Sequence, residues 1–242
     1  MTLDPRTPVI VGVGQYLHRA LQQGGTLDDS LEPAALMERA VLAACEDAGL
    51  DGPPAADSVR VVNIIGWRYR NAARFLAQRL GLNRDGWSGI ELAESTPGGN
   101  SPQSLVNVTA SEILDGTIDV AILSGAEAFK TYMTARKTGA SLPWPKAADD
   151  DLPRFIGKEL NMNLPEERER GLVMPVQIYP MFETALRAAA GRSVDDHQAY
   201  LGALYADLSK VAATNPHAWI QDAKTAEEIA TPSPKNRMIG FP

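Results

Sequence analysis

The fold is decided by the stretch Ile90-Glu-Leu-Ala-Glu-Ser-Thr-Pro-Gly-Gly-Asn-Ser-Pro-Gln-Ser-Leu-Val-Asn-Val-Thr-Ala-Ser-Glu-Ile-Leu-Asp-Gly116. Residues 90–93 form an apolar run typical of a β-strand, and the run breaks at Pro97-Gly-Gly99. A helix then begins at Asn100 or Ser101, either of which can cap it, and Gly116 ends it. A strand that turns on glycines into a capped helix directs backbone N–H groups towards one point, where an anion or an oxyanion can bind. The same residues are equally typical of an ordinary tight turn between a strand and a helix.

The helix also shows the signs of a regular first turn and of one apolar face. Pro102 suits the first turn, and Gln103 stands three residues after Asn100, as a capping box requires. Helical spacing predicts that the face packed on the sheet consists of Val106, Ala110, Ile113 and Leu114.

The composition is that of an ordinary soluble globular protein. The chain has 242 residues, of which 44% are hydrophobic and 22% charged, enough for one large domain or two small ones. Its net charge of −7 argues against a surface for nucleic acid or for anionic membranes. No apolar run is long enough to predict a transmembrane helix. The single cysteine, Cys45, excludes an internal disulfide framework and fits a reducing compartment, so we expect a cytoplasmic protein.

Strand and helix signals alternate over the first half of the chain. Strands are predicted at residues 7–14, 58–66, 86–93 and 118–124, and helices at residues 33–48, 71–80 and from 100 onwards. This alternation indicates a mainly parallel sheet covered by helices. Ligands bind at the carboxyl ends of such strands, which is where the pattern places Gly98-Gly99 and Gly125-Ala-Glu127.

The pattern changes from Phe129 onwards. Roughly fifty residues carry few helix or strand signals, and a structureless loop of that length is unusual inside a compact domain. We therefore expect a functional excursion or a small subdomain. Helices are predicted at residues 152–160, 165–170, 180–190, 194–213 and 226–230.

Two further motifs are weak signals of function. Gly12-Val-Gly14 begins like a dinucleotide-binding fingerprint, but Leu17 stands at the third glycine position and no helix follows directly. Cys45 lies in the last turn of a predicted helix beside two carboxylates, which raise the pKa of a thiol. We therefore interpret Cys45 as a buried side chain that packs in the core rather than as a nucleophile.

The order of these motifs resembles the N-terminal half of the thiolase superfamily, close to its sterol-carrier-type and acetyl-CoA acetyltransferase-like members. The resemblance extends over essentially the whole chain, and the segments that carry it besides the opening stretch are Thr7-Pro-Val-Ile-Val-Gly-Val-Gly14, Asp119-Val-Ala-Ile-Leu-Ser-Gly-Ala-Glu127, Asn215-Pro-His-Ala218 and Asn236-Arg-Met-Ile-Gly-Phe-Pro242. It implies an α/β, thiolase-like half-domain in residues 1–127, a mainly helical loop domain in residues 128–234, and the start of a second half-domain in residues 235–242. It also implies acyltransferase chemistry of the acetyl-CoA acetyltransferase type, with coenzyme A or acyl-CoA as ligand and no covalently bound cofactor.

The chain departs from this family at the nucleophile. In thiolases of this kind, the acylated cysteine lies 28 residues before the glutamate of the Gly-x-Glu motif, and that position is Gly99 in this sequence. Glycine cannot be acylated. The resemblance also implies a C-terminal half-domain with an activating histidine and a second cysteine. We therefore expect the natural protein to continue past Pro242 or to work with a partner subunit. Without that second half-domain, one apolar face of the first would be left exposed. The alternatives are a short protein whose own loop helices cover this face, and a homodimer.

Ser101 is the substitute nucleophile that the sequence offers, because the helix dipole stabilises an oxyanion at the first turn. A serine nucleophile needs a base within hydrogen-bond reach, and His18, after the first predicted strand, is the candidate. We expect His197 to be solvated and His217 to mark a turn. Helix capping is the simpler role for Ser101 and Asn100. The ligand-binding candidates are Gly98, Gly99, Asn100 and Gly125, and no metal-ligand spacing connects the histidines with the cysteine.

Two classes of function follow from these residues. One is a thiolase-type enzyme that acts on acyl-CoA. The other is a catalytically silent subunit that binds coenzyme A and assists a partner enzyme in lipid or sterol side-chain metabolism. Side chains that would meet the phosphates or line an adenine or acyl pocket, with solubility and core packing as their simpler roles, are Lys130, Arg136, Lys137, Lys146, Arg154, Trp144, Tyr179 and Phe182.

Overall fold

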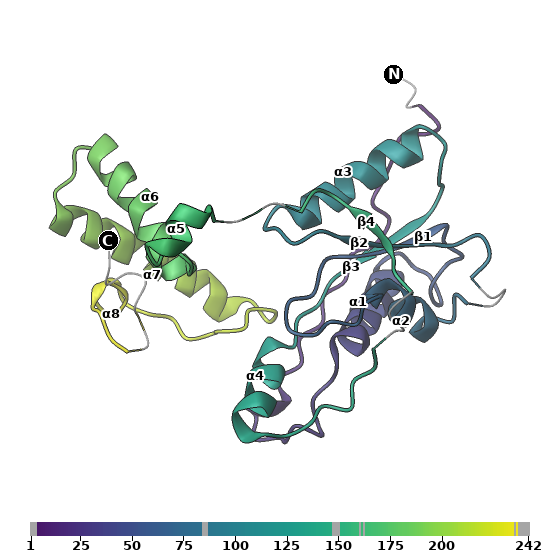
Figure 1. Cartoon of the computed structure of the whole chain (residues 1–242), viewed down its shortest axis with the longest axis horizontal. Helices are drawn as coiled ribbons and strands as arrows, with labels where there is room; N and C mark the ends of the chain where they lie inside the picture. Colours follow the sequence, from purple (N-terminus) through teal and green to yellow (C-terminus); the bar gives the residue numbers. More distant parts are fainter. Residues whose placement is uncertain are drawn as a thin grey trace. The chain divides into compact units, whose positions relative to one another are not determined.

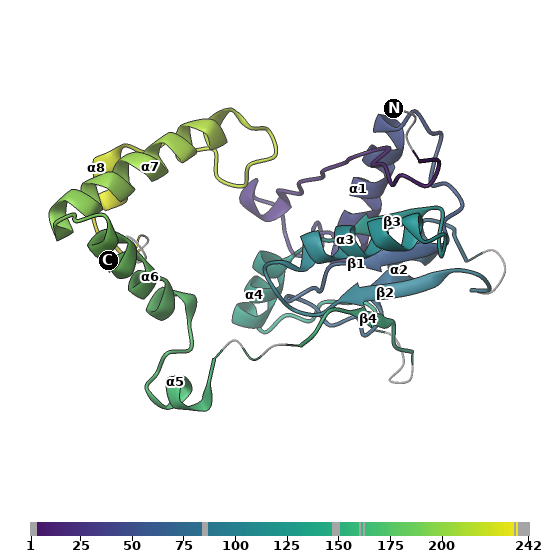
Figure 2. The same cartoon turned by 90° about the horizontal axis from the view of Figure 1, so that it is seen from above.

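A computed structural model describes residues 4–83, 87–146, 151–159, 161, 163–234 and 236 (Figures 1 and 2). By its internal contacts the chain divides into two compact units, Met1–Leu160 and Asn161–Pro242. The sequence predicts a domain boundary after residue 127, whereas the internal contacts divide the chain after Leu160. The predicted boundary stays a prediction.

The first unit is built on a parallel sheet. Its strands are β1 (Ser58–Val61), β2 (Glu91–Ser95), β3 (Ala121–Ser124) and β4 (Arg154–Ile156), in the order β3-β1-β2-β4. Each neighbouring pair is parallel. The predicted α/β class with a mainly parallel sheet is therefore confirmed.

Helices cover both faces of this sheet. Figures 1 and 2 show α3 (Ser101–Leu114) on one face and the pair α1 (Pro33–Asp47) and α2 (Ala72–Arg79) on the other. The larger core cluster lies between this pair and β1, and it includes Met37, Val41, Val59, Val61 and Leu76. Asn71 starts α2 as predicted, because its side chain accepts a hydrogen bond from the amide of Arg74.

The face that α3 turns to the sheet is not the predicted one. The buried residues of α3 are Ser101, Leu105 and Thr109, whereas Val106 and Leu114 are exposed. Leu105 forms a small core with Ala93 of β2 and Ile156 of β4. The prediction was wrong because it selected the apolar residues of α3, whereas the residues that are buried against the sheet are partly polar.

The first predicted strand is also wrong. Residues 7–14 form no strand, and Val9 and Ile10 are 69% and 77% exposed. The segment instead runs along α1, where a β-carbon at Gly12 or Gly14 would lie 2.1 Å from a backbone oxygen of that helix. Glycine is required at both positions for this close approach.

Two elements after β3 were not foreseen. Helix α4 (Phe129–Thr138) begins where the sequence shows few helical signals. Strand β4 replaces the helix that the sequence predicts over residues 152–160. Pairing with β2 and burial of Ile156 decide this strand, and neither contact is visible in the local sequence.

The second unit is helical. It contains α5 (Pro165–Glu169), α6 (Pro175–Ala189), α7 (Val194–Thr214) and α8 (Ala226–Ala230). The first unit contains, in addition to the elements above, a 3-10 turn (Ala20–Gln22). Helix α7 begins at the predicted residue, and Ser193 caps it by accepting from the amide of Asp196. Helix α6 begins earlier than predicted and contains Pro180. In α6, Tyr179 and Phe182 are 58% and 59% exposed, so core packing is the wrong role for both.

Across the described ranges, none of the helices combines the length and apolarity needed to span a bilayer.

Candidate functional site

The candidate site lies at the carboxyl edge of the sheet, as predicted. Because the strands are parallel, β1, β2 and β3 all end at this edge. Gly98 and Gly99 follow β2 on the way to α3, and Gly125 follows β3 directly. A β-carbon at Gly125 would lie 3.0 Å from Cβ of Val62, so this glycine allows the chain after β3 to pass close to β1.

Helix α3 begins without the predicted capping box. Asn100 occupies the N-cap position, but its side chain makes no capping hydrogen bond and its Nδ2 lies 3.3 Å from Oγ of Ser104. The side chain of Gln103 donates to Asn107 instead. Within the described part of the chain, the amides of Gly99, Asn100 and Gln103 have no hydrogen-bond partner. These amides are at the positive end of the helix, where an anionic or carbonyl oxygen is stabilised.

The space beside Gly99 is open. A β-carbon added at Gly99 would meet no atom within 4 Å, whereas one at Gly98 would lie 2.8 Å from Oδ1 of Asn100. The position that the thiolase resemblance gives to the nucleophile is therefore accessible next to unpaired amides.

Ser101 is held in a structural contact. It is 5% exposed, and its hydroxyl donates to the backbone oxygen of Thr96 at 2.7 Å. Its amide donates to the backbone oxygen of Gly98 at 3.1 Å. Both bonds tie the first turn of α3 to the loop after β2. The role of Ser101 as a nucleophile stays a prediction, and no described side chain accepts its proton as a base would.

Among the described residues, the hydrogen bonds of each histidine lie within its own compact unit. Nε2 of His18 lies 2.8 Å from the backbone oxygen of Asp29, and the structure shows no contact between His18 and Ser101. His197 is 1% exposed and lies 3.0 Å from Glu183, so its predicted solvation is wrong. His197 is in the first turn of α7, and α6 supplies the acidic partner that covers it. His217 is exposed and donates its amide to Asn215 in a turn, as predicted.

Two carboxylates at the carboxyl edge hold the loops around it. Glu94, near the end of β2, is 7% exposed and accepts from the amide of Ala72, which opens α2. Burial raises the pKa of Glu94, although its backbone hydrogen bonds act in the opposite direction. Glu127 accepts from the amides of Ile65 and Gly66, in the loop after β1. The sequence analysis missed the role of Glu94, and the available signal was an acidic residue at the end of an apolar strand.

An aromatic group lies in the loop after β1. The rings of Trp67 and Trp144 meet edge to face with centroids 5.2 Å apart, and Nζ of Lys146 lies 4.9 Å from the centre of a Trp67 ring. Nε1 of Trp67 donates to the backbone oxygen of Pro145. The structure therefore joins Trp144 and Lys146, both candidates from the sequence, through Trp67, which the sequence analysis did not select.

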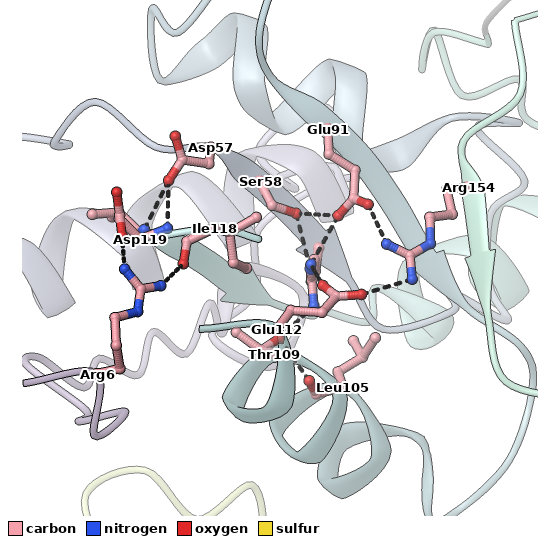
Figure 3. Close-up of polar contacts among 12 residues, drawn as sticks. Arg6, Asp57, Ser58, Glu91, Leu105, Thr109, Glu112, Ile118, Asp119 and Arg154 are labelled. Carbon is pink, nitrogen blue, oxygen red and sulfur yellow. Dashed lines mark hydrogen bonds and ion pairs between the residues drawn. The ribbon is translucent and has the colours of Figure 1, made fainter. Parts of the chain in front are cut away.

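The remaining basic candidates separate into two groups. Lys130, Arg136 and Lys137 line a shallow pocket of about 500 Å³ along α4. Arg154 is instead bound to Glu91 and Glu112 in ion pairs (Figure 3), so its charge is already paired within the protein.

This ion-pair network holds α3 on the sheet. Arg60 of β1 is fully buried and donates to Ser58, Thr109, Glu91 and Glu112. Figure 3 shows Arg154 reaching the same two carboxylates from β4. Burial tends to raise the pKa of Glu112, but hydrogen bonds from Arg154 and Arg60, together with their charges, lower it overall. Two arginines and two glutamates thus connect β1, β2, β4 and the helix that carries the candidate site.

The start of β3 is fixed by a second polar group, also drawn in Figure 3. The guanidinium of Arg6 donates to the backbone oxygens of Ile113 and Ile118, each at 2.8 Å. Asp57 accepts from the amides of Asp119 and Val120, and these backbone hydrogen bonds lower its pKa. These contacts bind the end of α3 and the start of β3 to the sheet.

Comparison with solved structures gives the fold a name. The chain is similar to the monomeric SCP2-thiolase-like protein type 1 of Mycobacterium smegmatis, with a TM-score of 0.68 and 28% identity, over 98% of this chain and 41% of that one. It is also similar to the Ltp2-ChsH2(DUF35) aldolase, with a TM-score of 0.57 and 19% identity, over 93% of this chain and 48% of that one. This chain therefore spans less than half the length of either.

No protein-family model and no curated protein matches the chain. The similarity to the two solved structures nevertheless extends over 98% and 93% of this chain. The chain has a thiolase-like fold.

Proposed function

We propose that this chain handles acyl-CoA thioesters as a thiolase-type protein of the acetyl-CoA acetyltransferase kind. The observation that carries the proposal is the start of α3, where the unpaired amides of Gly99 and Asn100 adjoin the open space at Gly99. A thioester carbonyl placed there would receive hydrogen bonds from the backbone at the positive end of a 14-residue helix.

The residues of this chain would supply binding and polarisation in that reaction. The amides would stabilise negative charge as it develops on the carbonyl oxygen, which is the usual effect of an oxyanion hole. They would not supply an attacking thiol, because Cys45 is buried on α1 and burial raises the pKa of its thiol. The attacking group would therefore come from another polypeptide segment or from a partner.

A second observation supports the proposal: the group formed by Trp67, Trp144 and Lys146 offers a binding place for the nucleotide of coenzyme A near the same edge of the sheet. An adenine ring stacks on indole, and an ammonium group attracts phosphate. This group follows β1, next to the loop that Glu127 holds.

The second candidate function is a silent subunit that presents an acyl-CoA to a partner enzyme. Two observations favour it: no thiol lies at Gly99, and the second solved neighbour is named as an assembly of two proteins, Ltp2 and ChsH2. Under this alternative the ligand binds at α3 and no product forms.

Ligand-dependent thermal unfolding tests the proposal. Coenzyme A and acetyl-CoA at about 100 times their Kd should stabilise the native chain by about 2.7 kcal/mol, because a ligand bound only by the native state shifts the unfolding equilibrium. Gly99→Leu should remove this stabilisation by filling the open space. Gly52→Leu is the matched control, because a β-carbon at Gly52 also meets no atom within 4 Å.

Because this chain itself supplies no attacking thiol, thiol release from acetyl-CoA separates the two functions when it is measured with the chain joined to the part of the M. smegmatis protein that it does not cover. Binding with release of free coenzyme A indicates the enzyme, and binding without release indicates the silent subunit. An unfolding temperature that stays the same with either ligand contradicts both.

A further inference from the structure

Helix α4 presents an outward face that is both basic and apolar. Residues at positions i, i+4 and i+7 of a helix lie on one side of it, so this face consists of two neighbouring rows. The two rows are Phe129, Met133 and Arg136, and Lys130, Thr134 and Lys137. All of these residues except Phe129 line the shallow pocket of about 500 Å³ along α4.

The rest of the first unit holds α4 in this orientation. Thr131 and Ala135, on the opposite side of the helix, are buried. A β-carbon at Gly66 would lie 3.3 Å from Cα of Phe129, so the loop after β1 packs against the start of α4. Gly139 ends the helix in the left-handed conformation, with φ of 72°. Figures 1 and 2 show α4 at the periphery of this unit. The outward face is therefore formed before any partner binds, which lowers the cost of association.

The charge of this face is opposite to that of the whole chain. Helix α4 contains no acidic residue, whereas the chain has a net charge of −7. Within the described ranges, no ion pair joins Arg136 or Lys137 to a carboxylate. Arg60, Arg79 and Arg154, by contrast, each pair with two carboxylates. The face of α4 is therefore complementary to an acidic surface.

Two large apolar side chains lie among these cations. Phe129 and Met133 are 49% and 43% exposed, and they are neighbours in the same row. Solubility accounts for the exposed lysines and arginine, but an exposed aromatic ring beside a methionine works against it. Aromatic residues, methionine and arginine are the types enriched at protein–protein interfaces. The combination indicates a protein partner rather than a small anion.

We propose that this face of α4 binds an amphipathic helix of a partner protein, in which a row of carboxylates lies next to a row of apolar side chains. The carboxylates would meet Lys130, Arg136 and Lys137, and the apolar row would pack on Phe129 and Met133. Lys130 and Lys137 are separated by about 10 Å along the axis, so carboxylates two turns apart on the partner can meet both. This proposal does not depend on acyl-CoA handling.

A model peptide tests the surface. The probe is an alanine-based helical peptide that carries one row of glutamates next to one row of leucines. The control peptide has the same composition in an order that scatters the glutamates around the helix. Titrated into the isotope-labelled full chain, the probe should shift the amide resonances of α4, and the scattered peptide should bind about tenfold more weakly, because several exposed ion pairs are lost. Equal affinity for both peptides, or shifts that leave α4 unchanged, overturns the proposal.

A matched pair of double variants tests the cations. Arg136→Gln with Lys137→Gln should weaken binding of the probe about tenfold at low ionic strength and should reduce its dependence on salt. Arg39→Gln with Lys158→Gln is the control, because it also removes two exposed cations, from positions outside α4. Equal weakening by the two double variants means that the probe responds to general charge alone, and the proposal fails.

The apolar row is tested at high ionic strength, where exposed charges are screened. Met133→Gln should still weaken binding of the probe there, about fivefold, because the leucines of the probe lose an apolar contact. Leu204→Gln is the matched control, since Leu204 of α7 is also 43% exposed. An unchanged affinity in Met133→Gln rules out a partner with an apolar row.

The same spectra distinguish two other occupants. If inorganic phosphate reproduces the shifts of α4 and displaces the probe, the face belongs to a small anion. If the resonances of α4 shift with protein concentration in the absence of the probe, the occupant is a second copy of this chain. Either result overturns the proposal.

Discussion

Gly99 combines open space with unpaired amides, and this combination has a chemical consequence for any side chain placed there. Gly99→Cys should give a thiol whose pKa is lowered by the start of α3, because a helix N-terminus stabilises a thiolate. We expect it to react with iodoacetamide at pH 7 about tenfold faster than Gly52→Cys, which has equal space and no adjoining helix start. Mass spectrometry of the alkylated chain measures both rates, with buried Cys45 as the slow internal reference. Equal rates for the two variants would show that the amides at Gly99 do not act on a nearby charge.

Glu94 gives a prediction for the pH dependence of stability. Burial raises the pKa of Glu94 in the native state above its ordinary value of 4.5, so the native state binds this proton more tightly than the unfolded state does. The corresponding stability is fully present below pH 4.5 and is lost as the pH rises through the raised native pKa. Glu94→Gln, which can still accept from Ala72, should therefore gain stability relative to the unmodified chain as the pH rises. Urea unfolding at several pH values measures the difference, and a difference independent of pH contradicts the assignment.

At the scale of elements, the Arg60 network decides how α3 and β4 are held. Arg60→Met removes a fully buried cation and leaves Glu91 and Glu112 with Arg154 as their cationic partner among the described residues, so we expect a loss of about 3–5 kcal/mol in the free energy of unfolding. Arg79→Met is the control, because Arg79 also pairs with two carboxylates but its side chain is 37% exposed. Its loss should stay near or below about 1 kcal/mol. Chemical denaturation compares the two, and equal losses would mean that burial of the network contributes nothing.

The same elements show where sequence analysis succeeds and where it stops. The first residues of α2 and α7 were predictable because Asn71 and Ser193 cap the N-termini of these helices through local hydrogen bonds. The buried face of α3 was not, because Thr109 is buried by its hydrogen bond with Arg60, a residue of another element. Strand β4 was missed for a similar reason, since its pairing with β2 spans a long separation in sequence.

The candidate site divides in the same way. The sequence placed Gly98 and Gly99 at the carboxyl edge correctly, because the positions of strand ends follow from the alternation of elements. It could not place His197, which α6 covers through Glu183, nor find Glu94 and Trp67, whose partners lie in other segments.

At the scale of the whole molecule, the division into two compact units predicts two unfolding transitions. Arg60→Met should lower only the transition of the first unit. Gly202→Val should lower only that of the second, because a β-carbon at Gly202 would lie 2.7 Å from the backbone oxygen of Ala226. Differential scanning calorimetry follows both. A single transition that moves equally with either substitution would show that the chain unfolds as one cooperative unit.

The exposed run Val9-Ile-Val11 has a consequence for how this chain behaves when concentrated. Uncharged β-branched residues in an extended segment favour cross-β aggregation. Proline opposes such aggregation, and Pro8 flanks this run at its N-terminal end alone. Self-stacking through this run should therefore increase as the protein is concentrated, and light scattering of the concentrated chain would detect it.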